Sequence, residues 1–416
     1  MEKPIARQII QILKIAIVTP FYPSPSGEDP GGIGNHFHHL AQGFSCEGHE
    51  IEVFQFPYTG ELKGTCEVGG VPVHRYGVSM PQWFRIRGLG RLARLTGYCE
   101  SYPSKCLLQL TRKVLKRHIQ ARGFEVIEAT SNRGLPLSYC RSQGKRLPVI
   151  TRVSTTMAHH FGENQQHPDI NQREETCFEK EVIRRSDALV THTRAHAKKL
   201  EEELGISSHR FEIIPHGIVI PAPPEPCSRS MNRELKVLFL GRFESRKGAD
   251  VLMDAIPKVL TNLSTVRFML AGRDEDGAYK KNFFDKHKGE ILRQVEFLGE
   301  VSDEKRTNLY KECDLFIAPS RYESFGIVYA EAMSFGKPVI GCDAGGAPEV
   351  IGDTAGLLAK VGDPEDLAAK ILVLCKNKEK RIQMGQNAYK RVRAFFSREK
   401  MVQDTLDLYA EVKRSF

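Results

Sequence analysis

Short apolar runs alternate with amphipathic stretches along the chain, and this pattern predicts an α/β fold. The first run, 12–19, is almost continuously apolar, as expected of a strand that helices cover on both faces. A loop rich in proline and glycine follows at 20–34, and a helix is expected from there to about Gly48. Further strands are predicted at 51–56, 125–129, 147–153 and 188–191, and further helices at 174–185 and 194–204. Strands that alternate with helices favour a parallel sheet with helices on both faces.

A proline cluster at 215–233 separates this series from a second one. Such a cluster is typical of a stiff, extended connector between domains. The second series comprises predicted strands at 236–240, 267–271, 295–298, 315–318 and 338–342, and predicted helices at 250–260, 305–312 and 327–335. Ser397 is a good N-cap for a final amphipathic helix at 397–414. The predicted units are an N-terminal domain (1–215), a linker (216–234), a C-terminal domain (235–396) and a terminal helix (397–416).

Composition agrees with a soluble, cytoplasmic protein. Hydrophobic residues make up 41% of the 416 residues and charged residues 27%. The ten cysteines are scattered without a C-x-x-C pair, a pattern that favours a reducing compartment over a disulfide framework. The apolar run from Ile9 to Val18 contains Gln11 and Lys14, and no small-residue cleavage site follows it, which favours a buried strand over a signal peptide. No run of 18 apolar residues is present.

The formal net charge of +9 arises from one segment, since 81–122 contains ten Lys and Arg and a single acid, Glu100. A helix over 86–95 would place Arg87, Arg91 and Arg94 on one side and apolar residues on the other. Segment 83–118 could therefore bind an anionic membrane surface, on the cytoplasmic face; the alternative is a helix packed on its domain with solvated arginines. Aromatic residues are few here and no recognition motif is present, so nucleic acid is not an expected partner.

Glycines and cations follow two of the predicted strands, where open parallel sheets bind their ligands. Gly31 and Gly32 lie between the first strand and the first helix, where backbone can approach a ligand closely. Arg242 and Lys247 lie in the run G-R-F-E-S-R-K-G that begins at Gly241. Two fixed cations at this point suit a diphosphate, although a solvated loop would have the same sequence.

Two carboxylates follow the strand at 315–318. Glu323 is expected in the loop and Glu331 inside the next helix, which begins near Phe325, Gly326 and Ile327. Carboxylates are good acceptors for vicinal sugar hydroxyls, and the helix N-terminus would direct free N–H groups into the crevice. A last Gly-rich loop, G-G-A-P-E at 345–349, is most simply a structural turn.

Taken together, these motifs resemble retaining GT-B glycosyltransferases of family 4, the "glycosyl transferases group 1" enzymes. The specific part is C-terminal: G-R-x4-K-G, then F-L-G at 297–299, A-P-S at 318–320, E-x7-E from Glu323 to Glu331, and G-G-A-P-E. The N-terminal match is thinner, with P-G-G at 30–32, G-H-E at 48–50 and I-P-H-G at 214–217.

The resemblance implies two Rossmann-like, doubly wound domains with a nucleotide-sugar donor in the cleft between them. It implies that Arg242 and Lys247 hold the diphosphate, that Glu331 binds the ribose and that Glu323 approaches the donor sugar. Gly31, Gly32 and the turn from Phe325 to Ile327 complete the donor site. It further implies a retaining hexosyl transfer with no cofactor and no bound metal, to a sugar or lipid-linked acceptor in glycan, polysaccharide or glycolipid synthesis. The last helix is expected to cross back to the N-terminal domain.

Two positions depart from the family pattern. Ser154 follows the strand at 147–153 where many relatives carry a histidine that contacts the donor sugar, and His216 replaces a frequent asparagine. Both are assigned to the sugar site. Three alternatives stay open: an epimerase or phosphorylase on the same architecture, a pseudoenzyme that only binds the nucleotide sugar, and, least favoured, a nucleic-acid binder.

Overall fold

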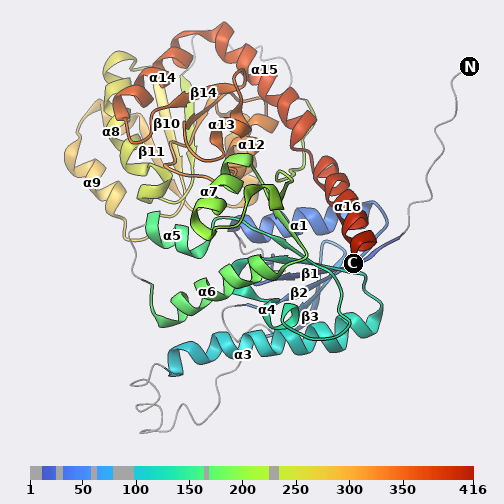
Figure 1. The fold of residues 1–416 in the computed structure, drawn as a ribbon. Helices are drawn as coiled ribbons and strands as arrows, with labels where there is room; N and C mark the ends of the chain where they lie inside the picture. The colour runs from blue at the N-terminus through green and yellow to red at the C-terminus, as the bar shows by residue number, and fades with distance from the viewer. Residues whose placement is uncertain (1–11, 25–30, 58–62, 78–97, 164–167, 224–233) are drawn as a thin grey trace, which may run out of the picture.

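The computed structural model describes residues 12–24, 31–57, 63–77, 98–163, 168–223 and 234–416. Strands β1 to β8 form one sheet and β9 to β14 another, each with helices on both faces (Figure 1). The predicted α/β class, with two Rossmann-like domains, is therefore confirmed. None of the helices in the described part of the chain combines the length and the apolar character that a bilayer crossing requires.

The N-terminal sheet has the strand order β3-β4-β2-β1-β5-β6-β7-β8. Its strands are β1 (Lys14–Thr19), β2 (Glu50–Gln55), β3 (Gly64–Val68), β4 (Val71–Arg75), β5 (Val126–Thr130), β6 (Val149–Arg152), β7 (Ala188–Thr191) and β8 (Phe211–Ile213). Alternate residues of β1 pack on opposite faces, Ile15 and Ile17 towards α1 and α16, Ala16 and Val18 towards α3. This explains the continuous apolar run.

One expectation for this sheet was wrong. The sheet is not purely parallel, because β3 pairs antiparallel with β4 in a hairpin at its edge. The residues of β3 are exposed or half-buried, so this strand carries no apolar run that would reveal it in the sequence.

The N-terminal helices begin with α1 (Gly31–Cys46), which starts earlier than predicted. Gly31 and Gly32 thus lie in the first turn of a helix and not in a loop, with the positive φ of +69° at Gly31 turning the chain into it. The others are α3 (Tyr98–Val114), α4 (Leu137–Cys140), α5 (Met157–Glu163), α6 (Ile170–Arg185) and α7 (Arg194–Leu204), with short 3-10 or π turns at η2 (Leu115–Ile119), η3 (Gln120–Arg122), η4 (Asn132–Gly134) and η5 (Ser208–Arg210).

The C-terminal sheet is entirely parallel, with the order β11-β10-β9-β12-β13-β14. Its strands are β9 (Leu235–Leu240), β10 (Val266–Ala271), β11 (Val295–Gly299), β12 (Leu315–Ile317), β13 (Val339–Cys342) and β14 (Gly356–Ala359). Its helices are η6 (Ser245–Lys247), α8 (Ala249–Asn262), α9 (Ala278–Lys286), α10 (Glu290–Arg293), α11 (Asp303–Glu312), α12 (Ile327–Ser334), α13 (Ala347–Ile351), α14 (Pro364–Lys376) and α15 (Lys378–Phe395). Helices α8 and α14 cover one face of the sheet, and α12, α13 and α15 the other.

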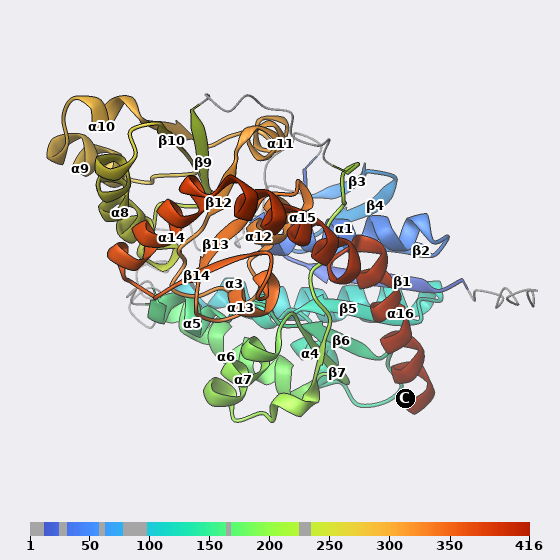
Figure 2. The same ribbon diagram turned by 90° about the horizontal axis from the view of Figure 1, so that it is seen from above.

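The last helix, α16 (Arg398–Ser415), lies on the N-terminal domain beside α1, as Figures 1 and 2 show. Its apolar side belongs to the N-terminal core, and the Tyr409 hydroxyl donates to buried Glu128 at 2.8 Å. Just before this helix, the Ile218 N–H donates to the Phe396 carbonyl at 2.9 Å, and the Arg398 N–H donates back to Ile218. The start of the predicted linker is therefore packed under the crossing helix.

Both sheets reverse their strand order beside their first strand, between β1 and β5 and between β9 and β12. Ligands of open α/β sheets bind at the carboxyl ends of the strands at such switch points. The segments that follow β9 and β12 are those that contain Arg242, Lys247 and Glu323.

Candidate functional site

The loop after β9 carries three cations that differ in their surroundings. Arg242 is 53% exposed, and its Nη2 lies 3.2 Å from Glu244 Oε1. Arg246 is buried and lies 2.8 Å from the same oxygen. Gly248 ends the loop with a φ of +68°, and a Cβ there would lie 1.9 Å from the Pro319 carbonyl oxygen. Glycine therefore lets this loop pack against the segment that follows β12.

Lys247 and Glu323 form an ion pair, with Nζ 2.5 Å from Oε1. The Lys247 side chain is 20% exposed and that of Glu323 10%, so Lys247 does not lie on a solvated surface loop as the sequence suggested. Ser320 Oγ also donates to Glu323 Oε1 at 2.9 Å. Burial alone would raise the pKa of Glu323, but the charges of Lys247 and Arg246 outweigh burial and lower this pKa.

Burial also lowers the pKa of Lys247, and the attraction of Glu323 offsets this only in part. The pair thus joins one acid and one base, partly shielded from water, at the switch point of the C-terminal sheet. Through Arg246 and Glu244 it connects to Arg242, since Arg246 lies 3.9 Å from Glu323. The structure brings together all three residues predicted to be catalytic.

A cavity of about 170 Å³ lies between the two domains. Residues of both domains line it, including Gly31, Gly32, His216, Ile327 and Glu331. Five of the predicted donor-binding and sugar-site residues therefore face one cavity. The domains are in contact here, since a Cβ on Gly32 would lie 3.9 Å from Ile327 Cδ1.

Tyr310 holds Glu331 in place at the wall of this cavity. The buried Tyr310 hydroxyl donates to Glu331 Oε2 at 2.8 Å. Burial, followed by the charge of Glu331, raises the pKa of Tyr310 well above its usual value, so the hydroxyl keeps its proton and acts as a donor. Glu331 is thus a carboxylate of fixed direction.

Three buried histidines form a cluster beside the cavity. His36 Nδ1 lies 2.7 Å from His216 Nδ1, and the rings of His192 and His216 stack with centroids 3.5 Å apart. Burial lowers the pKa of all three well below 6.5, so the imidazoles are neutral at pH 7. His36 also lines the cavity, and its buried Nε2 has no hydrogen-bond partner among the described residues.

Two other predicted residues, Ser154 and Phe325, contact this histidine cluster. Ser154 is not among the described residues that line the cavity; its Oγ lies 3.4 Å from His192 Nε2. Phe325 is buried and packs edge-on against His216, with centroids 5.1 Å apart. Gly326, at a φ of +88°, leads into α12, and a Cβ there would lie 2.4 Å from the Tyr329 ring. Ser154 and Phe325 are therefore placed to support His192 and His216.

No three His, Cys, Asp or Glu side chains of the described residues gather in a way that would hold a metal ion. Sequence reasoning missed His36, Tyr310 and Arg246. Arg246 had a visible signal, as a third cation in the G-R-x4-K-G run, whereas Tyr310 and His36 occupy ordinary helical positions.

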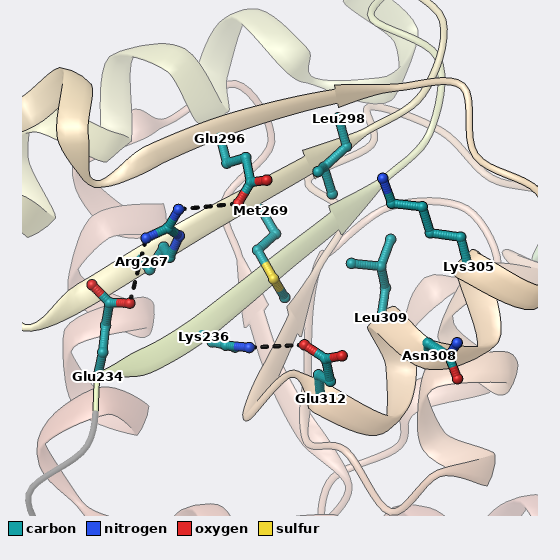
Figure 3. A pocket seen from close by; sticks show the side chains of 10 residues that line it. All are labelled: Glu234, Lys236, Arg267, Met269, Glu296, Leu298, Lys305, Asn308, Leu309 and Glu312. Carbon is teal, nitrogen blue, oxygen red and sulfur yellow. Dashed lines mark hydrogen bonds and ion pairs between the residues drawn. The ribbon is translucent and has the colours of Figure 1, made fainter.

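A larger hollow, of about 470 Å³, lies between the C-terminal sheet and α11 (Figure 3). Most of its charged side chains are paired, because Lys236 lies 2.8 Å from Glu312 and Arg267 lies 3.2 Å from Glu296. Lys236 and Arg267 are the second residues of their strands. The paired charges of the hollow thus lie at the amino ends of β9 and β10, opposite to the end at which open α/β sheets bind ligands.

Comparison with known families gives two matches, one for each domain. Residues 31–217 match the family model described as a glycosyl transferase 4-like domain. Residues 228–391 match the model described as glycosyl transferases group 1. The phosphatidyl-myo-inositol mannosyltransferase of Mycolicibacterium smegmatis is 26% identical over 335 residues, which cover 80% of this chain and 76% of that protein. The glycogen synthase of Mycobacterium tuberculosis is 23% identical over 77% of this chain and 76% of its own length.

Solved structures share the whole fold. Sucrose-phosphate synthase from Thermosynechococcus elongatus superposes with a TM-score of 0.75 over 97% of this chain and 100% of its own, at 18% identity. HepE from Anabaena, solved in complex with UDP-glucose, gives 0.67 over 97% and 100%, at 22% identity. At these identities the likeness shows the fold, which is the predicted GT-B fold.

Proposed function

This chain is a glycosyltransferase of the GT-B type, and from that premise we propose that it transfers a hexose-type sugar from a nucleoside-diphosphate sugar to a sugar or lipid-linked acceptor. The transfer retains the anomeric configuration and uses no metal ion. The observation that carries the proposal is the group formed by Arg242, Lys247 and Glu323 at the switch point of the C-terminal sheet.

The chemistry of the leaving group supports the assignment of these residues to the diphosphate. A nucleoside diphosphate leaves with growing negative charge, and fixed cations in a site partly shielded from water stabilise that charge more strongly than water does. Lys247 is such a cation, held at 2.5 Å by Glu323, and Arg242 adds a planar guanidinium suited to two phosphate oxygens. Two protein cations can thus supply the charge that a metal ion supplies at other diphosphate sites.

The relatives support a nucleotide-sugar donor. HepE was solved in complex with UDP-glucose, and a mutant of TarM from S. aureus, with a TM-score of 0.71, was solved with fondaparinux, alpha-GlcNAc-glycerol and UDP. We therefore propose a UDP-sugar donor, with the nucleotide against the C-terminal domain and the ribose on Glu331. An acceptor in glycan, polysaccharide or glycolipid synthesis, used at the cytoplasmic face of a membrane, fits the basic segment described below.

The test combines binding with turnover. In a thermal-shift panel of UDP, GDP, ADP and their sugars, a ligand at about 100 times its dissociation constant should stabilise the protein by roughly 2.7 kcal/mol. UDP and UDP-sugars are expected to give the largest shift. Incubation with the stabilising sugar nucleotide and candidate acceptors should then release the free nucleoside diphosphate. Donor isomerisation without release would identify an epimerase, and binding without either reaction a pseudoenzyme.

The described part of the basic segment forms the outer helix of the N-terminal domain. The predicted helix over 86–95 lies outside the described residues, but α3 and the turns after it lie on the side away from the C-terminal domain (Figure 1). Residues 104–122 include no acid, and their apolar side chains are buried in the domain core while Lys113 and Arg117 are exposed. We propose that this cationic surface binds anionic lipid.

Co-sedimentation with vesicles tests this surface. The protein should bind vesicles that contain phosphatidylserine, less so as salt is raised, and not vesicles of phosphatidylcholine alone. Lys113→Glu combined with Arg117→Glu should weaken binding by roughly thirtyfold, because each cation contributes about 1 kcal/mol to the free energy of membrane binding. The matched control reverses Lys280 and Lys281, exposed on α9 of the other domain. Equal effects of both pairs, or binding insensitive to salt, would argue against a specific membrane surface.

A further inference from the structure

Glu349, the last residue of the G-G-A-P-E loop, reaches across the cleft to the N-terminal domain. Its carboxylate accepts hydrogen bonds from the backbone N–H groups of Ala195 at 2.6 Å and Arg194 at 3.0 Å. These are the first two residues of α7, whose N-cap is Thr193. A helix N-terminus has free N–H groups and a partial positive charge, both of which a carboxylate stabilises. This loop is therefore more than the structural turn that its sequence indicated.

A second contact joins the same helix end to the loop that carries Glu323. Thr193 Oγ1 donates to the carbonyl oxygen of Ser324, the residue after Glu323, at 2.8 Å. Within the C-terminal domain, the Gly346 N–H donates to the Glu323 carbonyl at 2.7 Å. A Cβ on Gly346 would lie 2.5 Å from the Ser324 carbonyl oxygen and 2.9 Å from Thr193 Cγ2. The G-G-A-P-E loop, the Glu323 loop and α7 thus form one close-packed seam.

The C-terminal domain holds Glu349 rigidly on its own side. Arg391 of α15 donates to the carbonyl oxygens of Glu349 at 2.7 Å and Val350 at 2.9 Å. These bonds fix the backbone of α13, while the Glu349 carboxylate binds the N-terminus of α7. The two backbone N–H groups of α7 and the Glu349 carboxylate of α13 therefore join two rigid elements, one from each domain. Through this contact, the position of the N-terminal domain can affect the position of the Glu323 loop.

On the premise of the proposed transferase function, we propose that Glu349 is a positioning residue for sugar transfer. By binding the N-terminus of α7 it holds the two domains closed and sets the Glu323 loop against the N-terminal domain. On the same premise the N-terminal domain binds the acceptor and the C-terminal domain the donor, so closure brings the reacting atoms together. The contact acts mainly on the geometry of the reaction, because the charged residues proposed to hold the nucleotide, Arg242, Lys247 and Glu331, all belong to the C-terminal domain.

The variants Glu349→Ala, Glu349→Gln and Thr193→Val test this role in the full chain. Loss of a charge-assisted pair of hydrogen bonds should reduce kcat roughly tenfold in Glu349→Ala. Glu349→Gln keeps one acceptor oxygen and should fall about threefold. The KM for the donor and the affinity for UDP should change less than threefold in both. The control is Glu379→Ala, which removes an exposed carboxylate from the first turn of α15, away from the seam.

Small-angle scattering gives a readout that does not depend on activity. Glu349→Ala should have a larger radius of gyration than the wild type, Thr193→Val should change it in the same direction, and Glu379→Ala should not. Unchanged scattering in Glu349→Ala overturns the closure role even if the protein has no transferase activity. Altered scattering with an unchanged kcat, in a chain that does transfer sugar, overturns the positioning role. A loss of UDP affinity as large as the loss of kcat would instead place Glu349 in nucleotide binding.

Discussion

Replacement of Lys247 by alanine is expected to lower the rate of sugar transfer by about two to three orders of magnitude, the usual cost of one preorganised transition-state donor. Arg242→Ala should cause a loss of the same order. Both cations would stabilise the charge that develops on the leaving diphosphate, and water is a poor substitute because it must reorient as the charge forms. Steady-state kinetics with saturating donor and acceptor measure the effect.

The stability of the two variants should differ. Arg242 is 53% exposed, so Arg242→Ala should unfold at the temperature of the wild type. Lys247→Ala leaves Glu323, only 10% exposed, without its nearest cation, and should unfold at a lower temperature while remaining folded at 25 °C. Arg267→Ala is the matched control, since it removes a paired arginine near the amino end of β10. Near-normal turnover in either site variant would refute the diphosphate assignment.

The elements of the fold that the sequence predicted well are those with strong, local signals. The strand Ala188–Thr191 and the helix Arg194–Leu204 have the predicted bounds, because an apolar run, a Thr N-cap and a Gly205 stop mark their ends. The hairpin of β3 and β4 was missed, since an exposed edge strand has few apolar residues. Helix α3 was not predicted, because Pro103 and a dense series of cations obscure its apolar side.

The site was predictable where its residues stand in short motifs after a strand. Arg242, Lys247, Glu323 and Glu331 stand in short motifs, so the switch-point rule was enough to group them. The histidine cluster joins residues that are far apart in the chain, and His36 looks like any residue of an amphipathic helix. The contact made by Glu349 was not predicted, for a related reason. Its partners are backbone N–H groups of the other domain, and the sequence does not show which backbone N–H groups are available as donors.

Replacement of either glutamate of the E-x7-E motif is expected to change a different kinetic constant, KM for Glu331 and kcat for Glu323. Glu331 is fixed by Tyr310 at the cavity wall, and a ribose contact there exists in the substrate complex and in the transition state alike. Glu331→Ala should therefore raise the KM for the donor by roughly ten- to hundredfold, the value of hydrogen bonds to a charged group, with little change in kcat. Tyr310→Phe should change the KM in the same direction, by less.

Glu323→Gln should instead lower kcat, because on the proposed function this carboxylate lies beside the sugar whose anomeric carbon gains positive charge as the diphosphate leaves. The change also removes the carboxylate that competes with the phosphates for Lys247. UDP should thus bind Glu323→Gln at least as well as the wild type, whereas it should bind Glu331→Ala more weakly. Calorimetric titration of both variants with UDP decides between these roles. If Glu323→Gln loses affinity for UDP and Glu331→Ala keeps it, the two carboxylates have the opposite assignments, with Glu323 on the nucleotide and Glu331 on the reacting sugar.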